Sequence, residues 1–227
     1  LFCEGEFLMT DARTAELSKL AENAYRDVNI AFANELSMIA DSLDINAWDL
    51  IDLANHHPRV NILQPGPGVG GHCIAVDPWF IVATSPKHSA LIKTARQVND
   101  SKPQFVIDKL LEQAKRITGV KIATLGLAFK PNIDDLRESP ARQIVHQLSV
   151  ELPDATIMAV EPNIDDLPPD LATRDNVTLG ELGQSVEEAD IILLLVDHDE
   201  FARLDRSLIA EKIVHDTRGL WNKVAAD

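Results

Sequence analysis

The sequence has few cysteines and no long apolar segment. Its 227 residues include only two cysteines, Cys3 and Cys73, which lie far apart and form no CxxC pair. This usage excludes a disulfide-stabilised scaffold and favours a reducing compartment, so we expect a cytoplasmic protein. No apolar run is long enough to span a bilayer, and residues 1–9 lack the basic segment of a secretory signal. We therefore expect no membrane partner.

Basic residues are also scarce. Lys and Arg number 21 against 36 Asp and Glu, which gives a formal net charge of −15. The negative charge is spread along the chain, which argues for solubility and against nucleic acid as a partner. An anionic ligand would therefore need Lys or Arg side chains gathered at one place.

The first half of the chain has helical patterns. Residues 11–42 contain no Gly or Pro, and their apolar positions recur every three or four residues after the capping signal Thr10-Asp11. This spacing predicts one long helix. Further helices are expected at residues 47–55 and 89–100, so residues 10–105 are predicted to form a helical unit. Pro103 is expected to mark a kink or junction before another helix that extends to Ile117.

After residue 120, short apolar and β-branched runs alternate with helical patterns. They predict an α/β fold, with a doubly wound, Rossmann-like parallel sheet that has helices on both faces. The expected strands and helices cover residues 121–127, 140–150, 156–161, 186–189, 191–196, 208–212 and 213–216. Ligands of such sheets bind beyond the carboxyl ends of the strands, here residues 128–139 and the segments after Val160 and Asp216.

The segment from Pro65 to Pro78, here called the cysteine loop, places Cys73 among Gly and Pro residues with Asp77 four positions later. Gly allows the backbone to approach a ligand closely, and Pro prevents the loop from becoming a helix or central strand. Residues 66–71 superficially fit a dinucleotide fingerprint, but they follow no strand, so we reject that interpretation. Cys73 is either a nucleophile or a buried core residue, and its spacing does not decide between them.

Two further groups of polar residues have alternative interpretations. Lys19 and Asn23 share one face of the long helix with Asp27, and on spacing alone a solvated polar stripe is favoured. Histidine and cysteine side chains near the loop offer zinc-donor atoms, but no pair has a familiar ligand spacing, so no metal site is predicted. These side chains are those of His56, His57, His72 and Cys73. The pair His56-His57 is expected to end a helix.

Basic side chains are predicted to gather at one edge of the sheet. Lys130 and Arg137 follow the first strand, and Ser139-Pro140 begins the next helix. Two cations beside a helix amino-terminus suit a phosphate group, and Arg218 follows the last strand at the same edge. The alternative is a surface loop in which Arg137 pairs with Asp134 or Asp135.

Four blocks, in this order, resemble the nucleotide-sugar 6-dehydrogenase family, that of UDP-glucose and GDP-mannose dehydrogenases. They are residues 15–23, residues 57–61, the cysteine loop, and residues 126–130 with 137–139. Together they span essentially the whole chain. Within the family, the blocks are most similar to the branch that oxidises UDP-N-acetyl-D-mannosamine. His72 and residues 65–68 resemble those of enzymes that act on N-acetylated sugars.

The resemblance implies three parts. Residues 1–9 would be the last strand of a missing NAD-binding domain, residues 10–105 a central dimerisation region that carries the cysteine loop, and residues 106–227 a UDP-sugar-binding domain. It also implies NAD as the cofactor and a homodimer formed through the long helix. The glycine fingerprint and the catalytic Thr and Glu of the family would lie in the missing domain, so this chain alone is expected to be inactive.

The implied reaction is a twofold oxidation at C6 of a UDP-N-acetylhexosamine to the uronate, which supplies a precursor of surface polysaccharide. Cys73 would form a thiohemiacetal and then a thioester with the sugar. Lys19 and Asn23 would stabilise the oxyanion, and Asp77 would position Lys19 or the hydrolytic water. UDP-N-acetyl-D-mannosamine is the expected substrate, with UDP-N-acetylglucosamine and UDP-glucose as alternatives.

The same resemblance assigns the binding residues. Those expected to contact the UDP-sugar are Arg59, Gly70, Gly71, His72, Phe129, Lys130 and Arg218, with Arg59 reaching the site of a second subunit. Arg137 would contact NAD. One departure is that the stretch between Arg59 and Cys73 is slightly shorter than in UDP-glucose enzymes. A different class of function also stays open, a dimeric UDP-sugar-binding module without catalysis.

Overall fold

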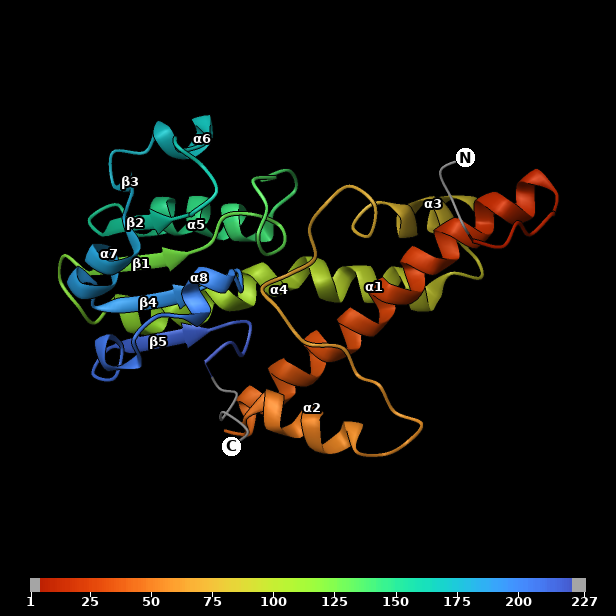
Figure 1. Cartoon of the computed structure of the whole chain (residues 1–227), viewed down its shortest axis with the longest axis horizontal. Helices are drawn as coiled ribbons and strands as arrows, with labels where there is room; N and C mark the ends of the chain where they lie inside the picture. Colours follow the sequence, from red (N-terminus) through yellow and green to blue (C-terminus); the bar gives the residue numbers. More distant parts are fainter. Residues whose placement is uncertain (1–4, 222–227) are drawn as a thin grey trace.

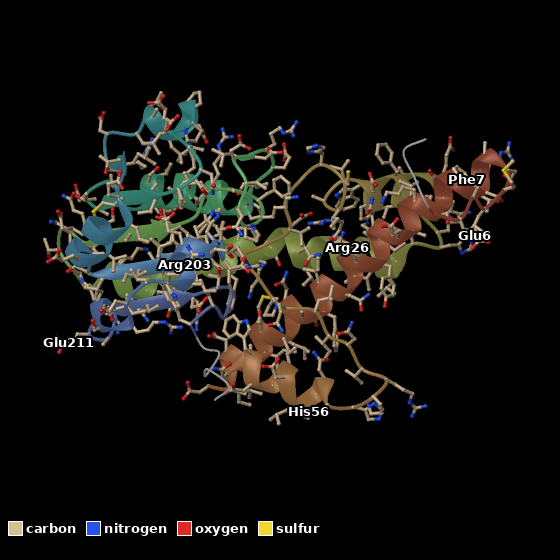
Figure 2. All side chains as sticks on the ribbon, viewed as in Figure 1. Glu6, Phe7, Arg26, His56, Arg203 and Glu211 are labelled. Atoms are coloured by element: carbon tan, nitrogen blue, oxygen red, sulfur yellow. The ribbon has the colours of Figure 1, made fainter. Side chains whose placement is uncertain are left out.

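The long helix α4 (Ala90–Ala114) joins a helical part to a sheet part in the computed structural model, which describes residues 5–221 (Figure 1). The helical part also contains α1 (Ala12–Ser42), α2 (Ala47–Asn55) and α3 (Asp77–Thr84). Glu6 and Phe7 lie beside the start of α1, at the end of the molecule opposite to Glu211 (Figure 2). The predicted helices at residues 11–42 and 47–55 are confirmed, and His56 ends α2 as expected.

Helix α1 begins where its sequence predicts, but it buries an unexpected face. The carboxylate of Asp11 accepts hydrogen bonds from the backbone N–H groups of Arg13 and Thr14 and so caps the helix. The buried positions of α1 are small or polar residues, namely Asn23, Ala24, Asp27, Ala31, Ala33, Asn34, Ser37 and Ala40. Several large apolar side chains of the same helix are at least half exposed, among them Tyr25 and Phe32.

Helix α4 continues through Pro103, so the junction predicted there is wrong. Proline removes one backbone hydrogen bond, and packing on either side of it preserves the helix. The first half of α4 packs against α1, and the second half contributes Val106, Ile107 and Leu110 to the core of the sheet part. The boundary expected between residues 105 and 106 therefore falls inside one helix, and the division into parts stays a prediction.

Residues 6–11 have no regular secondary structure. A strand needs a hydrogen-bonded neighbour, and no strand within residues 5–221 pairs with this segment. The strand expected at residues 1–9 includes residues 1–4, which lie outside the described range, so it stays a prediction.

The sheet part is the α/β domain that the sequence predicts. Its five parallel strands have the order β3-β2-β1-β4-β5. They are β1 (Lys121–Leu125), β2 (Thr156–Val160), β3 (Val177–Leu179), β4 (Ile191–Leu194) and β5 (Ile213–Asp216). The helices between them are α5 (Pro140–Glu151), α6 (Pro169–Ala172), α7 (Leu182–Glu188), α8 (Asp199–Ala202) and the short 3-10 helix η1 (Arg206–Leu208).

Helices cover both faces of the sheet, as a doubly wound fold requires. Ile122 and Ile157 face the side covered by α4 and α5, whereas Leu125 and Leu194 face the side that holds Phe201 of α8. Burial on both faces explains the nearly continuous apolar strands. Strand β3 and helices α3, α6 and α8 are too short for the sequence patterns to show, and the helix signal at residues 208–212 corresponds only to η1 and a turn.

The strand order places a ligand crevice between β1 and β4. Leu125 of β1 pairs with both Val160 of β2 and Leu194 of β4, so the carboxyl ends of these strands lie level. The chain leaves β1 and β4 toward opposite sides of the sheet, which is the arrangement at which doubly wound proteins bind ligands. Among the described residues, none of the helices combines the length and the apolar character needed to cross a membrane.

The turn after β1 depends on a glycine. Gly126 has a φ of +96°, and a Cβ added there would overlap the side chain of Val196. We expect Gly126→Ala to lower the free energy of unfolding by about 1–3 kcal/mol, measured by urea denaturation. Gly183→Ala in α7 is the matched control, because no atom lies within 4 Å of its added Cβ. An equal loss in both variants would contradict the strain at Gly126.

Candidate functional site

Cys73 lies on the surface of the cysteine loop with its side chain exposed, which excludes the buried-cysteine alternative. Its carbonyl accepts the backbone N–H groups of Val76 (3.2 Å) and Asp77 (2.8 Å), and these bonds lead the loop into α3. The glycine run that precedes it follows no strand and enters turns, so the fingerprint interpretation stays rejected. Cys3 lies outside the described residues.

Asn23 and Asp77 meet beside this turn. The amide Nδ2 of Asn23 donates to Oδ2 of Asp77 at 2.6 Å and so ties α1 to the start of α3. Asn23 is buried, whereas Lys19, one turn earlier, is exposed and pairs with Glu22 at 3.0 Å. The interpretation of these residues as a solvated polar stripe is therefore wrong for Asn23 and for the fully buried Asp27. Of the three, only Lys19 faces solvent.

A buried polar network connects α1 and α4 to the cysteine loop. Arg96 of α4 donates to Asp27 at 2.5 Å, and neither side chain is exposed. Asn99 donates to the same carboxylate at 2.8 Å and accepts the amide of Asn34 at 2.9 Å. Asn34 in turn accepts the backbone N–H of Gly66 at 2.9 Å. Burial raises the pKa of Asp27, although the charge of Arg96 and the hydrogen bond from Asn99 oppose this rise.

The cysteine loop packs directly on the loop that follows β1. A Cβ added at Gly70 would lie 2.9 Å from Cβ of Phe129, and one at Gly71 would lie 3.1 Å from its ring. Gly71 also has a φ of +80°, so only glycine fits this approach without strain. His72 is exposed beside these glycines.

Lys130 and Arg218 line one small cavity at the crevice between β1 and β4. The cavity has a volume of about 70 Å³ and also borders Pro67, Gly68 and Phe129. Arg218 donates from Nε to Asp197 at 2.8 Å, which holds the guanidinium at this edge. Lys130 is exposed, with its Nζ atom 5.6 Å from the ring centroid of Phe129. The site thus combines two cations with glycine backbone, a composition suited to phosphate.

Arg137 and Arg59 do not join this cluster. Arg137 pairs with Asp135 at 2.7 Å, which is the alternative that the sequence left open, and its side chain is 69% exposed. The hydrogen bond from Arg137 holds the pKa of Asp135 well below its usual range, and the same bond raises the pKa of Arg137. Arg59 is exposed on the loop after α2 and does not line the cavity.

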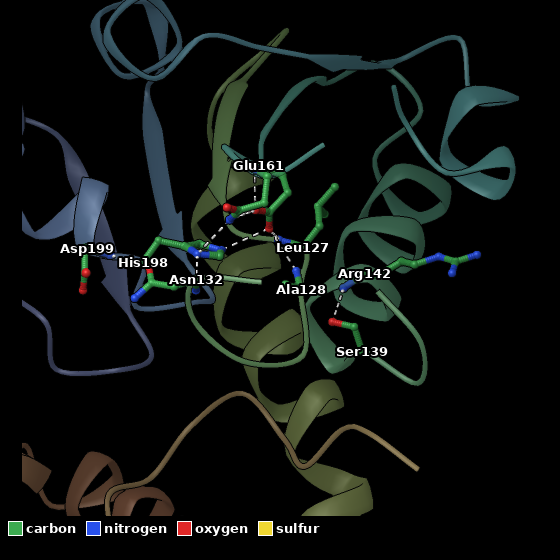
Figure 3. A network of polar contacts seen from close by, with 9 residues as sticks. Leu127, Ala128, Asn132, Ser139, Arg142, Glu161, His198 and Asp199 are labelled. Carbon is green, nitrogen blue, oxygen red and sulfur yellow. Dashed lines mark hydrogen bonds and ion pairs between the residues drawn. The ribbon is translucent and has the colours of Figure 1, made fainter. Parts of the chain in front are cut away.

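Sequence reasoning missed the acidic and histidine partners that hold these elements. Asp197 holds Arg218, and Glu161 with His198 contacts the loop after β1 (Figure 3). A usable signal existed for Glu161 and His198, because each is a polar residue just beyond a buried strand at the edge where ligands bind. No comparable signal identified Arg96, whose partner Asp27 is 69 residues away.

Two larger cavities border parts of the cysteine loop, the first at Pro65 and the second at Val69, Ala75 and Val76. One of about 670 Å³ contains Lys102, Phe105 and Trp221, and another of about 750 Å³ lies between α3, α4 and α5. Neither borders Cys73, Lys130 or Arg218. Because neither cavity is lined by the thiol or by the two cations, we place the site where Cys73, Lys130 and Arg218 lie and not at either of these cavities. Within residues 5–221, no group of three His, Cys, Asp or Glu side chains is arranged to hold a metal ion.

The residues present do not form a complete site for a nicotinamide dinucleotide. Among the described strands, none leads through a glycine fingerprint into a helix, which is how such cofactors are bound. Arg137 is the one side chain that the resemblance assigns to NAD, and its guanidinium is paired with Asp135.

The fold and the site define a nucleotide-binding type of α/β domain that faces a helical part carrying an exposed thiol. Two family models match these two parts. Residues 13–101 match the central domain of the UDP-glucose/GDP-mannose dehydrogenase family, and residues 123–223 match its UDP binding domain. The chain belongs to the UDP-glucose/GDP-mannose dehydrogenase family.

Curated relatives show the same relationship. The chain is 61% identical over 201 residues to the UDP-N-acetyl-D-mannosamine dehydrogenase of Campylobacter jejuni, a match that covers 88% of this chain and 49% of the relative. It is 56% identical over 222 residues to the NDP-N-acetyl-D-galactosaminuronic acid dehydrogenase of Ralstonia nicotianae, covering 98% of this chain and 52% of the relative. The chain therefore spans about half the length of the curated relatives it matches.

Solved structures agree with the fold. The structure of a UDP-D-ManNAc dehydrogenase from Pyrococcus horikoshii has a TM-score of 0.81 at 34% identity, over 99% of this chain and 53% of that one. A UDP-N-acetyl-mannosamine dehydrogenase from Staphylococcus aureus has a TM-score of 0.77 at 44% identity, over 100% of this chain and 51% of that one.

The buried Lys102 predicts a pH dependence of stability. Burial lowers its pKa from 10.5 to about 8, despite the nearby charge of Asp41. Between these two values the unfolded chain binds more protons, so the free energy of unfolding should rise with pH across this window, by roughly 2–3 kcal/mol. Urea denaturation from pH 7.5 to 10.5 measures the rise. Lys102→Met should flatten it, whereas Lys93→Met, at an exposed position of the same helix, should not; the same slope in all three proteins would contradict the assignment.

Proposed function

We propose that this chain forms the thiol-bearing and UDP-sugar-binding parts of an NAD-dependent nucleotide-sugar 6-dehydrogenase. The observation that carries the proposal is the convergence of three groups from distant segments. The exposed Cys73 lies one turn before Asp77, Asp77 bonds to Asn23, and the same loop packs on Phe129 beside Lys130. When bound, NAD accepts the electrons of two successive oxidations at C6 of the sugar.

Cys73 acts as the nucleophile. Its thiolate sulfur adds to the carbonyl carbon of the C6 aldehyde, a C–S bond forms, and the carbonyl electron pair moves to oxygen. Asn23 and Lys19 act as donors to this oxyanion from successive turns of α1. Loss of a hydride from C6 of this adduct would convert it to a thioester. Asp77, already bonded to Asn23 at 2.6 Å, would accept a proton from the water that hydrolyses the thioester to the acid and the free thiol.

The diphosphate of the nucleotide binds at the crevice between β1 and β4. Lys130 and Arg218 supply positive charge there, in a chain whose formal net charge is −15. Gly70 and Gly71 permit the close packing of the cysteine loop on Phe129, and His72 lies exposed next to them. Arg137 is assigned to NAD, for which it would have to leave Asp135.

UDP-N-acetyl-D-mannosamine is the proposed substrate, and acidic sugars for surface polysaccharide are the proposed use of the product. Support comes from the names of relatives in Campylobacter jejuni and Staphylococcus aureus. The galactosaminuronic acid enzyme of Ralstonia nicotianae is nearly as similar, so both N-acetylated sugars belong in any substrate comparison.

The outer face of α1 supports a homodimer. Leu17, Tyr25, Phe32 and Ile39 recur every seven or eight residues along it, and each is about half exposed or more. A stripe of this kind on a two-fold axis would bury itself against its own copy. Arg59, on the loop after α2, then extends toward the site of the second subunit.

The reaction is tested by joining this chain to an amino-terminal NAD-binding domain of the family and measuring NADH formed per UDP-N-acetyl-D-mannosamine consumed. We expect two NADH per sugar, and we expect Cys73→Ser to make no uronate. Full uronate formation by Cys73→Ser would rule out the nucleophile. Turnover of UDP-N-acetylglucosamine, UDP-glucose or an N-acetylgalactosamine nucleotide alone would correct the substrate. UDP binding without turnover of any sugar would support the non-catalytic binding module.

The dimer is tested separately by light scattering after gel filtration. Phe32→Asp places a charge on the exposed apolar face of α1, so we expect it to shift the protein from dimer to monomer. Phe80→Asp, at a similarly exposed position of α3, should leave the dimer intact. A monomeric wild-type chain would overturn the dimer proposal.

A further inference from the structure

Glu161 is a buried carboxylate directly after β2 that contacts no residue assigned above to the sugar or the cofactor. One carboxylate oxygen, Oε2, accepts the backbone N–H groups of Leu127 at 2.7 Å and Ala128 at 3.0 Å. The other, Oε1, accepts the amide of Asn163 at 3.0 Å. The side chain is fully buried, so its charge depends on these partners.

His198 extends this set of contacts to the far end of the same loop. Its Nδ1 accepts the backbone N–H of Asn132 at 2.9 Å, so the ring proton is on Nε2, which donates to Oε2 of Glu161 at 3.1 Å. Asn132 has a φ of +60° and accepts the N–H of Asp199 at 3.1 Å. Figure 3 shows these groups around the loop.

Glu161 and His198 therefore hold the loop at both ends. Glu161 binds it at Leu127 and Ala128, and His198 binds it at Asn132. The residues between these points include Phe129, which packs on the cysteine loop, and Lys130, which lines the cavity with Arg218. A loop fixed at both ends loses little freedom when a ligand binds, because its ordering is complete beforehand.

We propose that Glu161 and His198 are positioning residues that fix the Leu127–Asn132 loop, so that Lys130 is in place for the nucleotide diphosphate. The inference rests on the proposed function only for the identity of the ligand. It assigns a role to two buried residues that touch neither the sugar nor the thiol.

A double-mutant cycle in this chain tests whether Glu161 acts through Lys130. UDP is the probe, and isothermal titration calorimetry well below the unfolding temperature gives its Kd. We expect Glu161→Gln to weaken UDP binding about tenfold, because Gln loses the charge that several N–H groups share. In a Lys130→Ala background the same change should weaken binding less than about threefold, since the side chain that the loop positions is already absent.

Two further comparisons separate positioning from general stability. Ser149→Ala is the stability control, because Ser149 is fully buried and bonded to Arg174 at 3.0 Å but has no contact with the loop. It should lower stability and leave the Kd for UDP unchanged. His198→Asn, which retains an acceptor near the position of Nδ1, should bind UDP more tightly than His198→Leu. Hydrogen exchange at residues 127–132 should rise in Glu161→Gln but not in Ser149→Ala.

The outcomes are distinct. Suppose that the wild-type chain binds UDP. If Glu161→Gln then weakens UDP binding by the same factor in both backgrounds, or does not weaken it at all, the positioning role alone is overturned. Equal weakening by Ser149→Ala would also overturn it. A wild-type chain that does not bind UDP would overturn the proposed UDP site and this inference with it.

Discussion

The buried ion pair between Asp27 and Arg96 is the interaction on which the site depends. Neither side chain is exposed, and removing two charges from water costs several kcal/mol per ion unless their partners are in place. Asn99 donates to Asp27, and Asp100 accepts from Arg96. Asn34 donates to Asn99 and continues the network to the backbone N–H of Gly66. This network therefore fixes the positions of α1, α4 and the start of the cysteine loop relative to one another. Asn23, one turn before Asp27 on α1, is held in place with them.

The chemistry then depends on contact between two loops from different parts of the chain. The cysteine loop presents glycine backbone to Phe129, so the thiol and the cationic cavity are built on one packed surface. Each loop is supported by its own buried polar residues, Asn34 for the cysteine loop and Glu161 for the loop after β1. Polar groups inside both parts thus restrict flexible, glycine-rich segments whose own sequences would permit many conformations.

The sequence predicts features whose causes are local. The cap at Asp11, the uninterrupted helix after it and the apolar strands before the binding edge are all visible in short windows. The face that α1 buries is not, because Asn23 and Asp27 are buried by partners 54 and 69 residues away. At Pro103 the local sequence predicts a helix junction, because proline removes a backbone hydrogen bond, but packing on both sides of the residue keeps the helix continuous. The sites predicted at Cys73, Lys130 and Arg218 depend on motifs of several residues, whereas the residues that support these loops, such as Asn34 and Glu161, belong to no motif.

Helix α4 also affects how cooperatively the protein unfolds. It extends without interruption from its contact with α1 to the core beneath the sheet. Unfolding of either part would therefore expose apolar surface of a helix on which the other part also packs. The two family matches end at residue 101 and resume at residue 123, yet α4 extends to Ala114 between them. Because one helix crosses the border between the two sequence modules, we expect heat or denaturant to unfold both parts in one cooperative transition.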